Sequence, residues 1–355
     1  MRTILSILCV FALTILIGAE RLVAATSGAY TYTINGGAAT ITAYDGVWGA
    51  VSIPSSFNGV PVTGFGTSFR YTGITSITIP DTVTKIEDTA FMGCTYLTSV
   101  SIPNSVTSIG MSAFYACQYL TALTIPNSVT TIGASAFQTC MNLESIRIPD
   151  SVTIIKDYTF SNCVKLASVT MGNMVTSIGL GAFQYCSNLT SITLSESLTN
   201  INSAAFSSCT SLTSITIPQG VVNIGDNTFS FCSKLSKVLF KGSAPAKGSG
   251  TFRESFPTVY YLPGTTGWGE AYAGRPTVQL NQPSTQFYAL NGSGNGQLAW
   301  TAVQSFVYEI QSTDNLSVPF VYRATRIATS AGESWTDPEI VLPSQRFYRV
   351  RMVLP

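Results

Sequence analysis

One short pattern recurs at a constant interval across the middle of the chain. Seven cysteines mark it, each with phenylalanine three positions before it and leucine three positions after it: Cys94, Cys117, Cys140, Cys163, Cys186, Cys209 and Cys232. A period of roughly 20–29 residues is typical of a solenoid, in which every repeat is one coil that buries its apolar side against its neighbours. The spacing therefore predicts an elongated stack of coils between Ile74 and Phe240.

Each coil carries the same order of structural signals. In the coil that starts at Leu97, apolar and hydroxyl residues alternate up to Ile102, which predicts a short strand with one face inward. Pro103 ends that strand because proline cannot donate to a strand ladder. A second apolar pair follows and ends at a glycine corner. The segment with Phe114 and Cys117 then predicts an irregular or 3₁₀-like turn.

The full repeat carries a family resemblance. The pattern L-T-S-[IV]-[ST]-I-P-x-S-V-T-x-I-G-x-x-A-F-x-x-C resembles the BspA-type leucine-rich repeats of bacteria. The resemblance implies a mainly β fold: a leucine-rich-repeat solenoid of 23-residue coils with degenerate caps, followed here by a small all-β, sandwich-like domain. It also implies a secreted or cell-surface protein that binds other macromolecules, as an adhesin does, with no shared catalytic residues.

The segment before the regular repeats is expected to form two parts. The composition of residues 1–25 predicts a secretory signal peptide. Arg2 precedes an apolar run, and small residues stand at the expected cleavage site just before Thr26. No later stretch is apolar enough to predict a transmembrane segment after cleavage. Residues 26–73 predict an N-terminal cap with a hairpin around Asn35-Gly36-Gly37 and a degenerate first coil.

The rest of the chain divides into three parts. The seven regular repeats span residues 74–240. A degenerate last coil and a C-terminal cap, closed by Trp268 and Tyr272, are predicted for residues 241–280. The segment from Pro276 to Pro283 is predicted to be a linker. Residues 281–355 change to short alternating strands and predict a β-sandwich-like domain. This domain resembles fibronectin type III modules, and a sorting or attachment module is the alternative.

Composition narrows the function classes. The chain has no histidine and a formal net charge of +1. Without histidine, His-dependent nucleophilic catalysis and His-ligated metal sites are excluded, and no cofactor is expected. Nucleic acid is not an expected partner, since backbone binding needs a basic stripe that this sequence lacks.

Two surfaces are candidates for partner binding. The outward strand positions form rows of serine and threonine, interrupted by Glu144 and Arg147, with Asp150 just past the strand. A solvated hydroxyl face without a partner is the alternative interpretation. The second candidate consists of tyrosines at coil corners, Tyr96, Tyr115, Tyr119 and Tyr185. Tyrosine is enriched in binding hot spots, although these rings could instead cover neighbouring coils.

Three functions remain open at this point. The first is a non-catalytic binding platform for an extracellular protein or glycan, and the second is a structural spacer of the cell envelope. The third is a polysaccharide-acting enzyme that uses Asp150 and Asp157, which would need two carboxyls facing each other in a cleft. The repeat cysteines are expected to be buried, inert thiols, with a disulfide, metal or redox role as the alternative.

Overall fold

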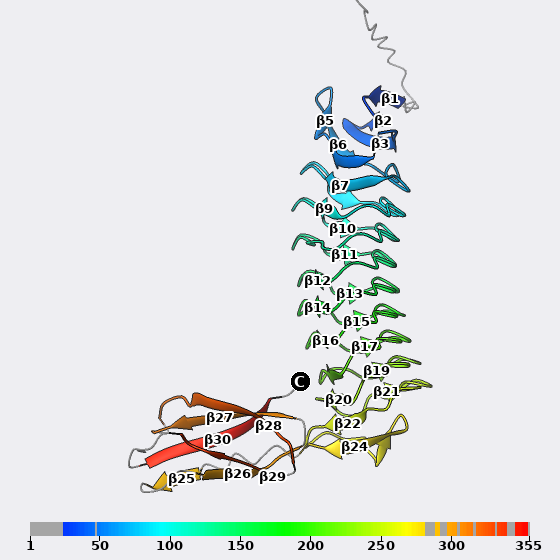
Figure 1. The fold of residues 1–355 in the computed structure, drawn as a ribbon. Helices are drawn as coiled ribbons and strands as arrows, with labels where there is room; N and C mark the ends of the chain where they lie inside the picture. The colour runs from blue at the N-terminus through cyan, green and yellow to red at the C-terminus, as the bar shows by residue number, and fades with distance from the viewer. Residues whose placement is uncertain are drawn as a thin grey trace, which may run out of the picture.

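The protein is a straight solenoid with a second β domain at its C-terminal end (Figure 1). The computed structural model describes residues 24–46, 48–280, 288–291, 297–303, 306–314, 317–330, 332–338 and 345–353. The predicted signal peptide lies outside these residues except for Ala24 and Ala25, which belong to β1 (Ala24–Ser27). The cleavage site therefore stays a prediction.

A small mixed sheet covers the N-terminal end of the stack. It joins β1 to the hairpin of β2 (Tyr30–Asn35) and β3 (Ala38–Tyr44), followed by β6 (Val60–Gly64) and β5 (Ser56–Phe57). Gly36 and Gly37 connect the hairpin at φ values of +56° and +78°, which glycine adopts without strain. The predicted hairpin is confirmed.

The first strand of most coils stacks in parallel on the next coil. We call this series the first ladder, and it forms three sheets: β4 (Gly49–Ser52), β7 (Ile74–Thr78) and β9 (Ser99–Ser101); β12 (Ser145–Arg147), β14 (Ser168–Thr170) and β16 (Ser191–Thr193); β18 (Ser214–Ile217), β20 (Lys237–Phe240), β22 (Thr258–Tyr261) and β24 (Arg275–Gln279), with β23 (Ala271–Tyr272) paired beside β24. Partners in adjacent regular coils occupy the same position of the repeat, as in Ser145 opposite Ser168. Equivalent side chains therefore line up in rows along the solenoid.

The first ladder departs from expectation in two places. Residues 121–126 form no strand, although Leu123 and Ile125 are buried as the repeat requires. In the preceding coil Val100 is only half-buried, which fits a looser contact at this break. Residues 275–279 form β24, so the predicted linker begins too early: Thr277 pairs with Val259 and continues the stack.

A second ladder runs along another edge of the coils. Its two-residue strands are β8 (Lys85–Ile86), β10 (Ser108–Ile109), β11 (Thr131–Ile132), β13 (Ile154–Ile155), β15 (Ser177–Ile178), β17 (Asn200–Ile201), β19 (Asn223–Ile224) and β21 (Ala246–Lys247). Five of these strands are followed by a corner glycine, at which neighbouring coils approach closely: Gly110, Gly133, Gly179, Gly225 and Gly248. A Cβ on Gly110 would lie 2.5 Å from the backbone nitrogen of Asp88.

The third edge, which we call the turn edge, agrees with the irregular alternative of the prediction and contains no 3₁₀-helix among the described residues. Two consecutive β-turns form it, with bonds from the Tyr115 amide to the Ser112 carbonyl and from the Cys117 amide to the Phe114 carbonyl, 3.1 and 3.2 Å long. The intervening amide of Phe114 donates to Ala136 in the next coil at 2.8 Å. Ser112 and Ala116 have φ values of +53° and +58°, which a 3₁₀-helix does not allow.

The core is a file of stacked aromatic rings. From Phe91 to Phe252 successive phenylalanines of the repeat lie 5.2–5.7 Å apart between ring centroids, with interplanar angles of 2–19°. Phe69 extends the file at 5.7 Å from Phe91, although it stands one position out of the repeat register. At the C-terminal end Trp268 and Tyr272 contact Phe240 and close the core, as predicted.

The C-terminal domain consists of two antiparallel sheets. One sheet has the order β25 (Tyr288–Asn291), β30 (Gln345–Val353), β27 (Val307–Thr313) and β28 (Val321–Ile327), and the other pairs β26 (Gln297–Thr301) with β29 (Gly332–Thr336). Buried Trp300 and Trp335 from the smaller sheet share a core with Tyr308 and Tyr348 from the larger one. The sheets agree with a small β domain, whereas the fibronectin type III resemblance is not confirmed.

This domain packs on the outward face of the last coils. Leu239, at the position where other coils expose threonine, is fully buried and joins the core of the C-terminal domain. Tyr260 contacts Phe306 at 5.0 Å between ring centroids, and the Lys237 ammonium lies 4.9 Å from the Phe306 centroid. The first ladder is therefore covered at its C-terminal end, and its outward face is open in the more N-terminal coils.

Candidate functional site

The open part of the first ladder presents hydroxyl rows and one charged pair. Ser145, Ser168 and Ser191 lie side by side in register and are exposed. Glu144 and Arg147 flank Ser145 and are also exposed, so the structure brings both predicted charges onto one coil of this face. Backbone pairing is satisfied within the sheet, which leaves these side chains available to a partner.

Asp150 lies just past β12, as expected, and it also bonds to the next coil. Its carboxylate accepts a bond of 2.7 Å from the backbone amide of Asn173 in the next coil. Asp157 does the same with the amide of Leu180, also at 2.7 Å. Both carboxylates therefore help to join coils, a role that the sequence pattern of isolated acids did not suggest.

The four candidate tyrosines lie in two parts of the solenoid. Tyr96 and Tyr119 belong to one row and stack at 6.1 Å between centroids with an interplanar angle of 9°. Tyr115 is half-buried on the turn edge. Tyr185 lies exposed on the turn edge in a left-handed backbone conformation, with φ +61°.

Trp48 extends the row of Tyr96 and Tyr119, and sequence reasoning missed it. Its ring lies 5.0 Å from that of Tyr96 and is 70% exposed. It occupies the space above Gly73, whose added Cβ would lie 2.4 Å from the indole. Gly73 stands one full repeat before Tyr96. The available sequence signal was a glycine, Gly73, at the repeat position that carries tyrosine in the next two coils. Trp48 itself could not be found from the period, because it falls outside the repeat register. We call Trp48, Tyr96 and Tyr119 the aromatic row.

Each repeat cysteine is buried and free. The thiol of each donates a hydrogen bond to a phenylalanine carbonyl of the preceding coil, as in Cys163 to Phe137 at 3.2 Å. Burial raises the pKa of Cys186 and of Cys232 to about 12. A reactive thiol needs a lowered pKa, so this environment favours inert, structural cysteines.

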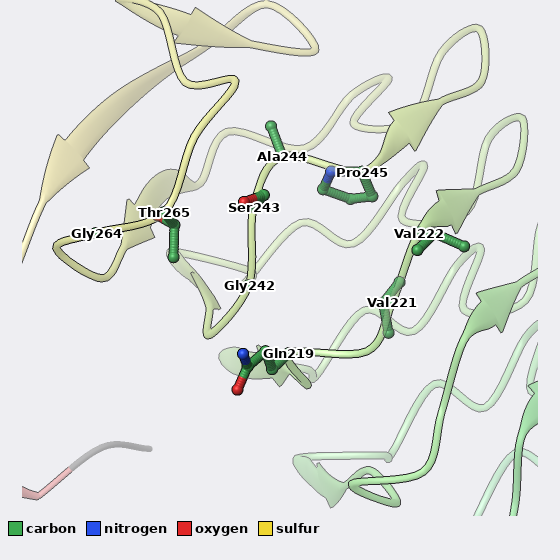
Figure 2. Close-up of a pocket in the computed structure, with 9 residues that line it drawn as sticks. All are labelled: Gln219, Val221, Val222, Gly242, Ser243, Ala244, Pro245, Gly264 and Thr265. Carbon is green, nitrogen blue, oxygen red and sulfur yellow. The ribbon is translucent and has the colours of Figure 1, made fainter.

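Several shallow hollows lie between the coils. Figure 2 shows one of about 310 Å³ near the C-terminal coils, lined by small and polar groups that include Gln219, Ser243 and Thr265. A smaller one of about 130 Å³ lies on the first ladder beside the exposed ion pair of Glu196 and Lys241, whose charged atoms are 2.7 Å apart. Within the described residues, no group of three or more Cys, Asp or Glu side chains could hold a metal ion.

Comparison with known proteins decides the family. The family model described as "BspA type Leucine rich repeat region" matches residues 66–188 and 153–262, with six copies. The chain belongs to the BspA-type leucine-rich-repeat family. No curated protein matches the chain. This family consists of repeat proteins that are typically secreted or exposed on bacterial surfaces, where they serve as interaction platforms.

The chain is similar to several solved structures, and the first of them shows the same fold. A leucine-rich repeat protein from Bacteroides ovatus is 23% identical, with a TM-score of 0.55, and the match covers 72% of this chain and 76% of that one. A leucine rich cell surface protein from Faecalibacterium prausnitzii is 25% identical over 62% of this chain and 89% of its own, with a TM-score of 0.32. The leucine-rich repeat protein of T. pallidum is 25% identical over 70% and 88%, with a TM-score of 0.35.

Membership of the BspA-type family agrees with the site geometry. The family consists of non-enzymatic repeat proteins, and the two acids considered for catalysis accept hydrogen bonds from backbone amides here. In the part of the chain that the structure describes, no helix has the length and apolar character needed to cross a membrane.

Proposed function

We propose that this BspA-type protein acts outside the cytoplasm, secreted or on the cell surface, as a non-catalytic platform that binds an extracellular protein in the manner of an adhesin. The aromatic row carries the proposal. Its three rings are 70%, 47% and 51% exposed, for Trp48, Tyr96 and Tyr119 in that order. Large exposed rings that contact one another offer a partner a preassembled apolar patch.

The position of the row supports a protein partner. Trp48 directly precedes β4, and Tyr96 stands shortly before β9, so the row borders the open first ladder. Glu144 and Arg147 are exposed on the coil that follows that of Tyr119. Aromatic and arginine anchors surrounded by hydroxyl groups resemble the composition of protein-binding hot spots. The stacked coils hold these groups at fixed spacing, which lowers the entropic cost of docking.

The test is a binding measurement with a matched variant. Mature protein is passed over immobilised extracellular matrix proteins, and saturation is measured by surface plasmon resonance. We expect at least one saturable partner, whose affinity falls tenfold or more in the variant Trp48→Ser/Tyr96→Ser/Tyr119→Ser. Tyr322→Ser serves as the control, because this ring is 57% exposed but lies in the C-terminal domain.

Two outcomes oppose the proposal. Self-association without any saturable partner would favour the spacer function. If a partner binds the triple variant with unchanged affinity, its docking surface does not include the aromatic row.

A further inference from the structure

We propose that the turn edge of the central coils holds a separate binding site for a neutral carbohydrate. A hollow of about 410 Å³ lies there between consecutive coils. The residues that line it are two tyrosines, three residues with side-chain amides and two with hydroxyl groups: Tyr158, Tyr185, Gln138, Asn162, Gln184, Thr139 and Ser161. Its volume falls within the range of small-ligand sites, roughly 300–1,000 Å³.

The lining has the chemistry that recognises sugars. Each amide offers a carbonyl acceptor and an NH₂ donor, which together match the donor and acceptor capacity of neighbouring sugar hydroxyls. The tyrosine rings offer apolar faces for the C–H groups of a pyranose and phenolic hydroxyls for hydrogen bonds. No lining residue carries a charge, so the hollow favours a neutral glycan over an acidic one.

The polar side chains around the hollow are not needed for the hydrogen bonds that join the coils. The backbone amides of Thr139, Asn162 and Tyr185 donate to carbonyls of the next coil at 2.8, 2.7 and 2.9 Å. The neighbouring side chains are therefore not needed as partners of these backbone amides. Among the residues that the structure describes, the amide groups of Gln138 and Gln184 have no hydrogen-bond partner.

Tyr185 occupies a turn position that has a left-handed backbone in every regular coil. Its φ is +61°, and Thr139, Asn162 and Phe231 at the same position have φ values of +64°, +60° and +58°. The backbone conformation is therefore general to the stack. Among the coils from Gly93 to Ser208, Tyr185 is the one aromatic residue at this position, and it is 52% exposed.

Other aromatic residues at the same turn position are covered by a cation. The Arg253 guanidinium lies 5.7 Å from the Phe231 ring centroid, and that of Arg70 lies 4.9 Å from the Tyr71 centroid. Within the described part of the chain, Tyr185 has no such cation and no ring contact. Its face is therefore available for a ligand in the hollow.

The test uses calorimetric titration of the mature protein with neutral oligosaccharides: maltotriose, cellotriose, lactose and N,N′-diacetylchitobiose, with sialyllactose as the charged comparison. We expect saturable binding of at least one neutral sugar and a loss of tenfold or more in Tyr185→Ser and in Gln184→Ala. Tyr185→Gly relieves the backbone strain, so it is expected to keep or raise the melting temperature while it loses the sugar.

Controls separate this site from the aromatic row. Phe231→Ser, at the same turn position two coils further on, and the triple serine variant of the aromatic row are both expected to bind the sugar normally. The proposal is overturned by absence of binding to every neutral sugar, by preference for sialyllactose, or by equal losses in Phe231→Ser and Tyr185→Ser.

Discussion

The thiol of Cys140 donates a 3.2 Å hydrogen bond to the carbonyl oxygen of Phe114 in the preceding coil. The same bond recurs along the stack, and in the last coil Ser255 replaces cysteine and donates to the Phe229 carbonyl at 2.7 Å. Each cysteine therefore links two coils through a hydrogen bond and also fills apolar space in the core. The serine in the last coil supports the hydrogen-bond role, because it keeps a donor at that position.

The hydrogen-bond role of the cysteines predicts a difference between two substitutions of similar size. Cys140→Ser keeps a donor to Phe114, whereas Cys140→Ala removes it. We expect the alanine variant to have the lower free energy of unfolding, by about 0.5–1.5 kcal/mol, the usual net value of such a bond. Urea unfolding followed by circular dichroism measures the difference. If the alanine variant is as stable as the serine variant, the hydrogen bond does not contribute and the cysteine only fills space.

The buried thiols also predict alkaline instability. An unfolded thiol has a pKa of about 8.5, and burial raises that of Cys186 to about 12. The unfolded state therefore loses protons first, so the stability present below about pH 8.5 decreases as pH rises towards 12. The Cys186 thiol contributes a slope of about 1.4 kcal/mol per pH unit in this window. Comparison of Cys186→Ser with the parent protein between pH 8 and 10.5 isolates one thiol, and equal slopes would contradict its burial.

The phenylalanine file predicts that damage depends on position. Phe137→Ala removes a ring stacked at 5.3 and 5.4 Å between Phe114 and Phe160, and we expect a loss of about 3–5 kcal/mol in the free energy of unfolding. Phe252→Ala is expected to cost less, because a terminal coil can fray without dividing the stack. Thermal melts of both variants make the comparison, and equal losses would argue against a one-dimensional array.

The turn edge predicts an unusual stabilising substitution. Ala116 has φ +58°, where an L-residue is strained by roughly 1–2 kcal/mol. Ala116→Gly relieves this strain and costs about 0.4–1 kcal/mol of chain entropy. We expect a small net gain in stability, measured by urea unfolding. Ala113→Gly, at a buried position outside the left-handed region, serves as the control and is expected to destabilise.

The junction of the two domains predicts a separable contact. Leu239→Ala creates a cavity where the last coils meet the C-terminal domain, with an expected cost of about 2–5 kcal/mol. We expect faster proteolytic release of a C-terminal fragment while the repeat coils stay protected. Val238→Ala, on the inward face of the same strand, is the comparison, since it is expected to loosen the coil itself.

The constant repeat period predicted the solenoid and its inward residues, because a repeated apolar pattern is buried most simply by stacking its copies. The closure by Trp268 and Tyr272 was predicted from the size of these rings in the degenerate segment after the last regular repeat. The break at residues 121–126 and the left-handed turns were not predictable, since alanine, serine and asparagine occupy positions where glycine would have signalled them. The contact between the last coils and the C-terminal domain could have been predicted, because Leu239 and Tyr260 place apolar groups on the outward side of strands whose inward side is also apolar.

The candidate sites were harder to predict than the fold. Tyr96 and Tyr119 were singled out as corner aromatics and do stack in one exposed row, but Trp48 lies outside the period and Tyr185 lies on a different edge. Asp150 could not be distinguished from Glu144 in sequence, because its bond to Asn173 depends on how closely two coils approach at a corner.

The most direct test of the continuous buried core is a thiol count on the chain that begins at Thr26. With a small aromatic disulfide reagent, we expect almost no reaction in the native protein and seven reactive thiols in denaturant. Rapid reaction of several thiols in the native protein would contradict the stacked core on which the binding surfaces depend.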